Sequence, residues 1–191
     1  MRNIGVVMSF LMLMNLAEGL EINLTKEYYD VAPDDAETIQ LAMMKASHLG
    51  DVNSQNHTVG GYEASTMISR MQLAHDNGQC KAKVFEMKLN GVMTLPRLKM
   101  GNYSLKIRQT FEYEQIALEE HENVHAEIWQ SSLKNFEEKV RGMIVQDNEN
   151  CDQLINEINQ EMAKVLDEIL YRNLEFDCIS YGDQLNLAQC H

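Results

Sequence analysis

The sequence has few basic residues, since 16 Lys and Arg stand against 29 Asp and Glu and the net charge is −13 at pH 7. Proteins that bind nucleic acid or an anionic membrane surface hold phosphate groups with clustered Lys and Arg side chains. We therefore expect no nucleic-acid partner and no docking onto anionic lipid.

The sequence also lacks the short motifs of several enzyme classes. It contains no Gly-rich phosphate-binding loop and no Gly-x-Ser-x-Gly nucleophile elbow. It has no cysteine with a nearby histidine that an oxidised, exported chain would keep as a reactive thiol. These absences weigh against nucleotide-binding, serine-hydrolase and thiol-dependent enzymes.

No apolar run is long enough to span a membrane, although a short one lies near the N-terminus at residues 4–14, after Met1-Arg2-Asn3. Ala17-Glu18-Gly19 then supplies small residues two apart, as a signal peptidase site requires. We expect residues 1–19 to be a cleaved signal peptide and residues 20–191 to form one domain. The protein is then secreted or periplasmic, with no stable membrane insertion after cleavage. A retained N-terminal anchor is the alternative.

Cysteine is scarce, but its four copies are an even number in a chain that is expected to be exported. They are Cys80, Cys151, Cys178 and Cys190. An even number in an oxidising compartment predicts two disulfides, with three possible pairings. We favour Cys80–Cys151 and Cys178–Cys190, because the second bridge would tie the C-terminal tail to the preceding turn. A thiolate zinc site is the alternative, although the cysteines are scattered and form no Cys-x-x-Cys pair.

Hydrophobic periodicity predicts an α+β domain. We expect strands at residues 21–29, 62–73 and 81–94, a short helix after Pro33-Asp34-Asp35, and long helices at about residues 105–144 and through residues 154–170. Asp76-Asn77-Gly78 is a strong hairpin turn, and Leu95-Pro96 is expected to close the β part. The simplest arrangement is a long antiparallel helical hairpin packed on a small antiparallel sheet.

The chemical motif of the chain is His121-Glu122-Asn123-Val124-His125, a His-Glu-x-x-His pattern inside the first long helix. Residues four apart lie on one face of a helix, so both imidazoles can bind one Zn²⁺. Glu122 then lies beside them as a candidate general base. The alternative is that both histidines belong to an exposed, acidic helix surface. The helical position and the expected export favour the zinc site.

A catalytic zinc site needs a third protein ligand and an open position for water. If the helical hairpin turns near Asn148, residues near 171–175 lie level with the two histidines. Ligand candidates in or just beyond that stretch are Glu168, Tyr171, Glu175, Asp177 and Tyr181, and none is a histidine. The other histidines, His48, His57 and His75, are expected in or beside loops, and His191 reaches the site only if the tail folds back.

Several further segments occur in a specific order along the chain. They are Tyr28-Tyr29-Asp30 before a helix near Ala36, Cys80 opening a strand that ends in Thr94-Leu95-Pro96-Arg97, the His121–His125 motif, Cys151, and Phe176-Asp177-Cys178-Ile179-Ser180-Tyr181-Gly182. In this order they resemble the bacterial exported proteins grouped as domain of unknown function 922. Those proteins are described as predicted secreted zinc-dependent proteases of the zincin superfamily. The resemblance implies a zincin-like fold, a Zn²⁺ cofactor and a protein or peptide substrate.

The closing segment departs from the pattern of that family. There, Tyr-Asp, a Thr and then a His-Gly pair provide a histidine as the natural third ligand, whereas this chain has Ser180-Tyr181-Gly182. We therefore predict Tyr181 as an oxygen ligand, with Glu168 and Glu175 in reserve.

Two functions follow from these observations. The first is a metallopeptidase in which Glu122 is the general base and the strand at residues 81–94 offers an edge to an extended peptide. The second is a catalytically inactive exported binding module that has lost its third ligand, or holds a structural zinc ion.

Overall fold

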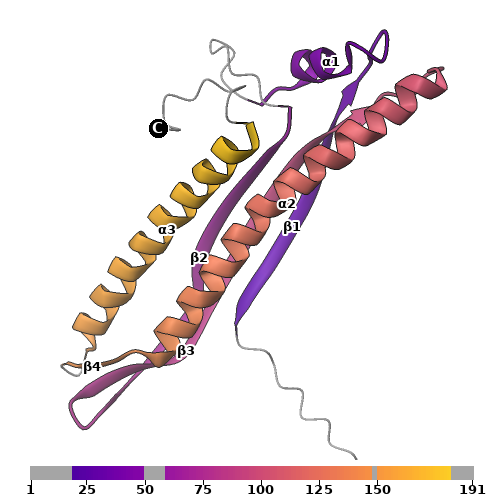
Figure 1. Cartoon of the computed structure of the whole chain (residues 1–191). Helices are drawn as coiled ribbons and strands as arrows, with labels where there is room; N and C mark the ends of the chain where they lie inside the picture. The colour runs from indigo at the N-terminus through magenta and orange to yellow at the C-terminus, as the bar shows by residue number, and fades with distance from the viewer. Residues whose placement is uncertain (1–18, 50–58, 148–149, 182–191) are drawn as a thin grey trace, which may run out of the picture.

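The computed structural model describes residues 19–49, 59–147 and 150–181, which form an α+β structure of four strands and three helices (Figure 1). The elements are β1 (Leu20–Val31), α1 (Ile39–Ala46), β2 (Gly61–Asp76), β3 (Gln79–Leu98), α2 (Leu105–Gly142), β4 (Ile144–Gln146) and α3 (Asp152–Tyr181). Residues 1–18 of the expected signal peptide, His57, Cys190, His191 and the side chain of Tyr181 lie outside the described part. Within that part, no helix has the length and apolar character needed to cross a membrane.

The sheet is mixed, whereas the sequence analysis predicted an antiparallel one. β3 is central, with β2 antiparallel along one edge and β1 parallel along the other. β4 continues the β1 edge by pairing antiparallel with the start of β3, at Gln79–Lys81. The prediction that residues 81–94 offer an edge to a peptide is therefore wrong for residues 87–94, because β1 and β2 pair with them on both edges. Periodicity locates strands along the chain but not their neighbours in the sheet.

The β2–β3 hairpin confirms the predicted turn. Asn77 and Gly78 have φ values of 52° and 76°, and positive φ at both central residues is the geometry that Asn-Gly favours in a two-residue hairpin. β3 then continues two residues beyond Pro96, although Leu95-Pro96 was expected to close it. Proline is tolerated here because the pairing with β2 already ends opposite Thr94.

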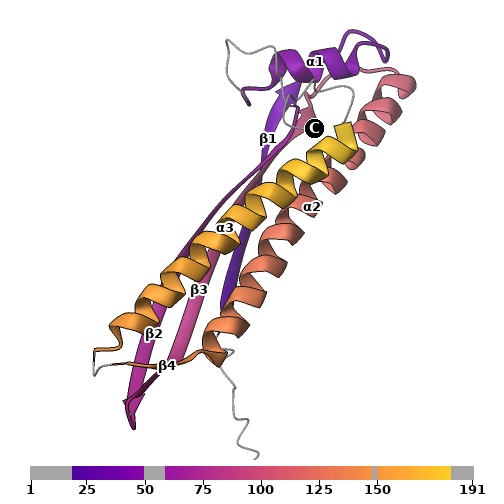
Figure 2. The same ribbon diagram turned by 60° about the vertical axis from the view of Figure 1, so that its left-hand side comes forward.

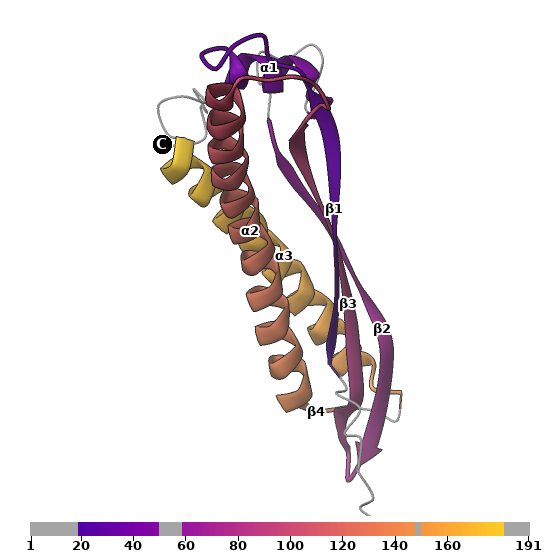
Figure 3. The same ribbon diagram turned by 90° about the vertical axis from the view of Figure 1, so that its right-hand side faces the viewer.

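The helices begin at identifiable caps. The Ser104 hydroxyl accepts a hydrogen bond of 3.2 Å from the Ile107 amide, which fixes the first turn of α2. Asp35 accepts hydrogen bonds from the amides of Glu37 and Thr38, so it caps a turn that precedes α1 rather than the helix itself. α2 and α3 lie on the same side of the sheet (Figure 3), and α1 lies across one end of it (Figure 1).

The largest hydrophobic core lies between β3 and the two long helices. Its buried members include Phe85, Met87 and Leu89 from β3, Leu133, Phe136 and Val140 from α2, and Leu154, Ile158 and Ile169 from α3. The buried Cys80–Cys151 disulfide, with a Cα–Cα distance of 5.6 Å, joins the start of β3 to the residue before α3, as expected. Cys178 is disulfide-bonded as well, and Cys190, its predicted partner, is not described.

Candidate metal centre

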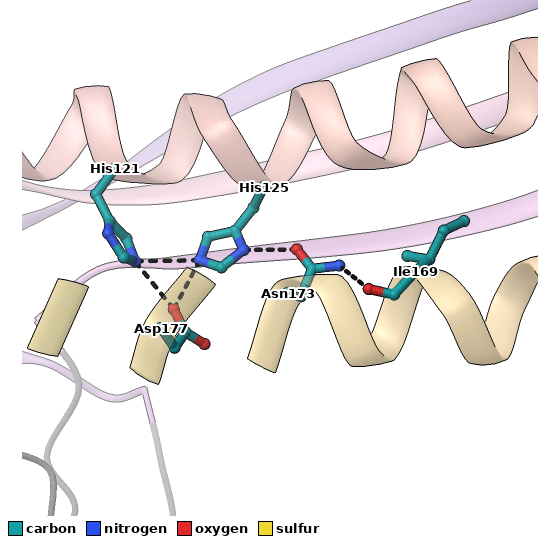
Figure 4. Close-up of polar contacts among 5 residues, drawn as sticks. All are labelled: His121, His125, Ile169, Asn173 and Asp177. Carbon is teal, nitrogen blue, oxygen red and sulfur yellow. Dashed lines mark hydrogen bonds and ion pairs between the residues drawn. The ribbon is translucent and has the colours of Figure 1, made fainter. Parts of the chain in front are cut away.

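The His-Glu-x-x-His motif lies in the middle of α2, where this helix runs beside the last turns of α3 (Figures 2 and 4). Ala126 and Ile128 are buried, which anchors this part of α2 in the interior. His121 and His125, four residues apart, both point toward α3. The local sequence thus forms a helix with both imidazoles on one face, as predicted.

Asp177 of α3 completes a cluster of three potential metal ligands. Its Oδ1 atom lies 3.1 Å from Nε2 of His121 and 3.0 Å from Nε2 of His125. The two Nε2 atoms are 3.1 Å apart. Tetrahedral Zn²⁺ with bonds of about 2.0–2.1 Å requires ligand atoms about 3.3 Å apart. The triangle of three atoms is therefore close to one face of a zinc tetrahedron.

The chemistry of these atoms also fits a cation. A neutral histidine carries one ring N–H, so its other nitrogen is an acceptor, as is a carboxylate oxygen. Acceptor atoms at about 3 Å repel one another unless a proton or a metal ion lies between them. Two nitrogens and one carboxylate oxygen are a common donor set for catalytic zinc.

Electrostatics keeps Asp177 negatively charged. Partial burial alone raises the pKa of this carboxyl, but hydrogen bonds and positive charge from His121 and His125 lower it to about 2. Burial alone lowers the pKa of His125, yet the hydrogen bonds to Asp177 and Asn173 raise it overall. A negatively charged oxygen thus faces His125, and in the metal-free protein it stabilises the protonated form of that imidazole, whose place a metal cation would take.

Glu122 is buried beside the cluster, with 4% of its surface exposed. Burial raises the pKa of its carboxyl, and this outweighs the lowering by the charges of His125 and His121. A Cβ atom on Gly60, just before β2, would lie 2.9 Å from Oε1 of Glu122 and 2.8 Å from Leu118. The glycine therefore makes room for the carboxyl group at this point.

Three side chains on one face of α3, spaced three and four residues apart, contact the His-Glu-x-x-His motif. Besides Asp177, the ring of Phe176 stacks on His121 at 4.6 Å and meets the edge of His125 at 5.2 Å. Oδ1 of Asn173 lies 2.6 Å from Nδ1 of His125. One face of α3 thus supplies a potential ligand, an aromatic ring and a hydrogen-bond partner.

The structure brings together His121, Glu122, His125 and Asp177, but not the other candidate ligands. Glu168, Tyr171 and Glu175 are exposed. Among the described residues, no further His, Cys, Asp or Glu joins the cluster. The role predicted for Tyr181 stays a prediction, because this residue ends α3 and its side chain is not described.

The sequence analysis named Asp177 only as one of five candidates and did not consider Asn173 or Phe176. The available signal was the helical register. In residue number, the midpoint of the pair His121–Asp177 is 149, and so is the midpoint of the pair His125–Asn173. The hairpin was assumed to turn one residue earlier, at Asn148. A shift of one residue in the turn moves the level positions from 171 and 175 to 173 and 177.

A family profile, described as bacterial protein of unknown function (DUF922), matches residues 26–182. No curated protein and no solved structure matches the chain. The matched segment contains the His-Glu-x-x-His motif, Asp177 and the Cys80–Cys151 pair, and it spans most of the 191 residues. The chain therefore belongs to this family of bacterial proteins of unknown function, DUF922.

Proposed function

We propose that this protein is an exported zinc-dependent metallopeptidase with a zincin-like site in which His121, His125 and Asp177 bind the metal. One observation carries the proposal: two Nε2 atoms and one carboxylate oxygen from two helices converge to mutual distances of 3.0–3.1 Å. The family match adds no activity to this argument, since its description assigns none.

Zinc, when bound, supplies a Lewis acid that acidifies water and polarises a carbonyl group. Glu122 follows His121 directly and has a raised carboxyl pKa, so it is suited to accept a proton from the attacking water. It then delivers this proton to the leaving amine. Asp177 contributes a negative charge to the ligand set, and Phe176 covers the imidazoles with an apolar ring.

An extended peptide would pair with β2 in this proposal. β2 is an outer strand of the sheet, and within the described residues no strand pairs with its second edge. It begins at Gly61, next to Gly60, which packs against Glu122. Strand addition at this edge would bring the peptide backbone past the general base.

The test is the metal content of the purified protein, followed by peptide cleavage. We expect about one zinc per chain in the wild type and none in His125→Ala, by elemental analysis. Glu122→Gln should retain the zinc and lose cleavage of a denatured protein substrate by about 10²–10⁴-fold, the usual contribution of a general base. Glu120→Gln is the matched control, because Glu120 is an exposed acid two residues earlier on the same helix.

Other outcomes would reject the proposal in different ways. If the wild type binds zinc but neither it nor the two glutamate variants cleave the substrate, the result would favour a structural zinc ion in a binding module. A wild-type protein that takes up no zinc on incubation with the metal would favour an inactive module that keeps the fold alone.

A further inference from the structure

The side chain of Asn173 makes two hydrogen bonds of opposite sense. Its Nδ2 group donates to the backbone carbonyl of Ile169 at 2.6 Å, one turn earlier on α3. Its Oδ1 atom faces Nδ1 of His125 at 2.6 Å (Figure 4). A backbone carbonyl can only accept, so the amide cannot be reversed without losing this bond. Asn173 therefore presents an acceptor to His125.

This arrangement favours one of the two positions for the proton of neutral His125. A neutral imidazole has one N–H, and the bond to Asn173 requires that it lie on Nδ1. The lone pair is then on Nε2, which lies 3.0 Å from Asp177 and 3.1 Å from Nε2 of His121. Nε2 is the atom that the proposed zinc site needs in its unprotonated form.

The other tautomer would close the site. With the proton on Nε2, His125 would donate a hydrogen bond directly to Oδ1 of Asp177. That bond would occupy two of the three ligand atoms at once, and zinc would have to break it before binding. The Asp177 carboxylate draws the proton toward Nε2 in the metal-free protein, and the acceptor at Nδ1 counteracts this, because loss of the proton from Nδ1 would leave two lone pairs facing each other there.

We propose that Asn173 is a positioning residue that stabilises the Nδ1–H tautomer of neutral His125 and so makes Nε2 available to a metal ion. This inference rests on the proposed zinc site for its functional meaning. The tautomer itself is a property of the metal-free protein. Hydrogen bonds of this kind to metal-binding histidines contribute about 10–100-fold to metal affinity in other proteins.

The first measurement is the tautomer of His125 in the metal-free protein, by ¹⁵N NMR of the imidazole nitrogens at a pH where the ring is neutral. We expect the wild type to populate the Nδ1–H tautomer beside the Nε2–H tautomer that Asp177 favours. In Asn173→Leu, which has similar volume and no acceptor, we expect the Nδ1–H fraction to fall. Asn159→Leu is the matched control, since Asn159 is exposed on the same helix and should leave His125 unchanged.

The second measurement is zinc affinity by competition with a chelator. Asn173→Leu should bind zinc about 10–100-fold more weakly than the wild type. Asn173→Asp keeps an oxygen opposite Nδ1 and should restore both the Nδ1–H tautomer and most of the affinity. If Asn173→Leu does not fold, Asn173→Ala removes the same acceptor with a residue that favours helix.

The two measurements separate this inference from the proposed function. An Nδ1–H fraction that is the same in the wild type and in both acceptor-free variants overturns the role of Asn173, whether or not zinc binds. Unchanged zinc affinity in those variants overturns it as well. A tautomer that changes as expected in a protein that never binds zinc rejects the metallopeptidase and leaves the hydrogen-bond assignment correct.

Discussion

The two long helices hold their parts of the metal centre in different ways. α2 packs on β3, and the side chains of His121 and His125 are 10% and 11% exposed. The side chain of Asp177, on α3, is 34% exposed. α3 is tied covalently next to its start through Cys151 and near its end through the disulfide-bonded Cys178, and side chains join it to α2. The sheet therefore supports the imidazoles, whereas the position of the carboxylate depends on how α3 is held beside α2.

This contrast shows where the geometry of the site is vulnerable. Contacts between the helices occur at intervals, from Lys139 with Glu161, through Ser132 with Arg172, to His125 with Asn173. A change that loosens α3 removes Asp177 from the cluster while both imidazoles stay in place. A change on the sheet side of α2 instead affects Glu122.

The largest effect is expected from Asp177, the α3 ligand. Asp177→Ala should reduce zinc affinity by more than the roughly 100-fold that a change outside the ligand shell causes, because a direct ligand is lost. Tyr181→Phe should leave the affinity unchanged if Asp177 is the third ligand. Chelator competition measures both. The reverse result, with zinc lost in Tyr181→Phe and kept in Asp177→Ala, would restore the ligand set predicted from the sequence.

Removal of the Cys80–Cys151 disulfide tests the covalent anchor at the start of α3. The bridge spans 71 residues, and the loop entropy of such a cross-link corresponds to about 4 kcal/mol. We expect Cys80→Ala/Cys151→Ala to lose about this much free energy of unfolding in urea. The folded fraction should still bind zinc, since the ligands meet through helix contacts far from the bridge. Loss of zinc at full folding would show that the anchor also sets the position of Asp177.

Gly60→Ala tests the sheet side of α2. The added Cβ atom would lie 2.8 Å from Leu118 and 2.9 Å from Glu122, so one of these side chains must move. Such overpacking costs about 1–3 kcal/mol. We expect lower thermal stability and lower peptidase activity, with zinc content unchanged. Gly142→Ala is the control, because nothing lies within 4 Å of its added Cβ atom, and it should not lower stability.

The smallest expected effect is a pH dependence of the metal-free protein. The lowered pKa of Asp177 stabilises the folded protein at pH values above 3.8, which is the pKa of this carboxyl in the unfolded chain. This stabilisation is lost as the pH falls toward 2. The raised pKa of His125 stabilises the folded protein at pH values below 6.5, which is the pKa of this imidazole in the unfolded chain. This stabilisation is lost as the pH rises through the pKa in the folded protein. The melting temperature in chelator should therefore fall from pH 6 to pH 8. Asp177→Asn should flatten this dependence, and an unchanged slope would contradict the His125–Asp177 ion pair.

Much of the local structure could be predicted because its causes are local. The Asn77-Gly78 turn follows from backbone preferences of two residues, and the apolar spacing of the long helices marks their positions. The start of α1 was placed too early because Asp35 caps a turn and not the helix. The parallel pairing of β1 with β3 was missed for another reason. Strand order depends on contacts between segments about 67 residues apart, such as Leu24 and Gly91, that no local pattern specifies.

The sequence by itself determined the α2 half of the candidate site. His121, Glu122 and His125 lie within one and a half helical turns, so helix geometry alone brings both imidazoles to one face. Only the tertiary structure decided the α3 half. Asn173, Phe176 and Asp177 reach the motif because two helices pack in a particular register, and a shift of one residue in the turn would present different side chains. The geometry within one helix follows from the local sequence, whereas the register between α2 and α3 is set by the packing of the whole core.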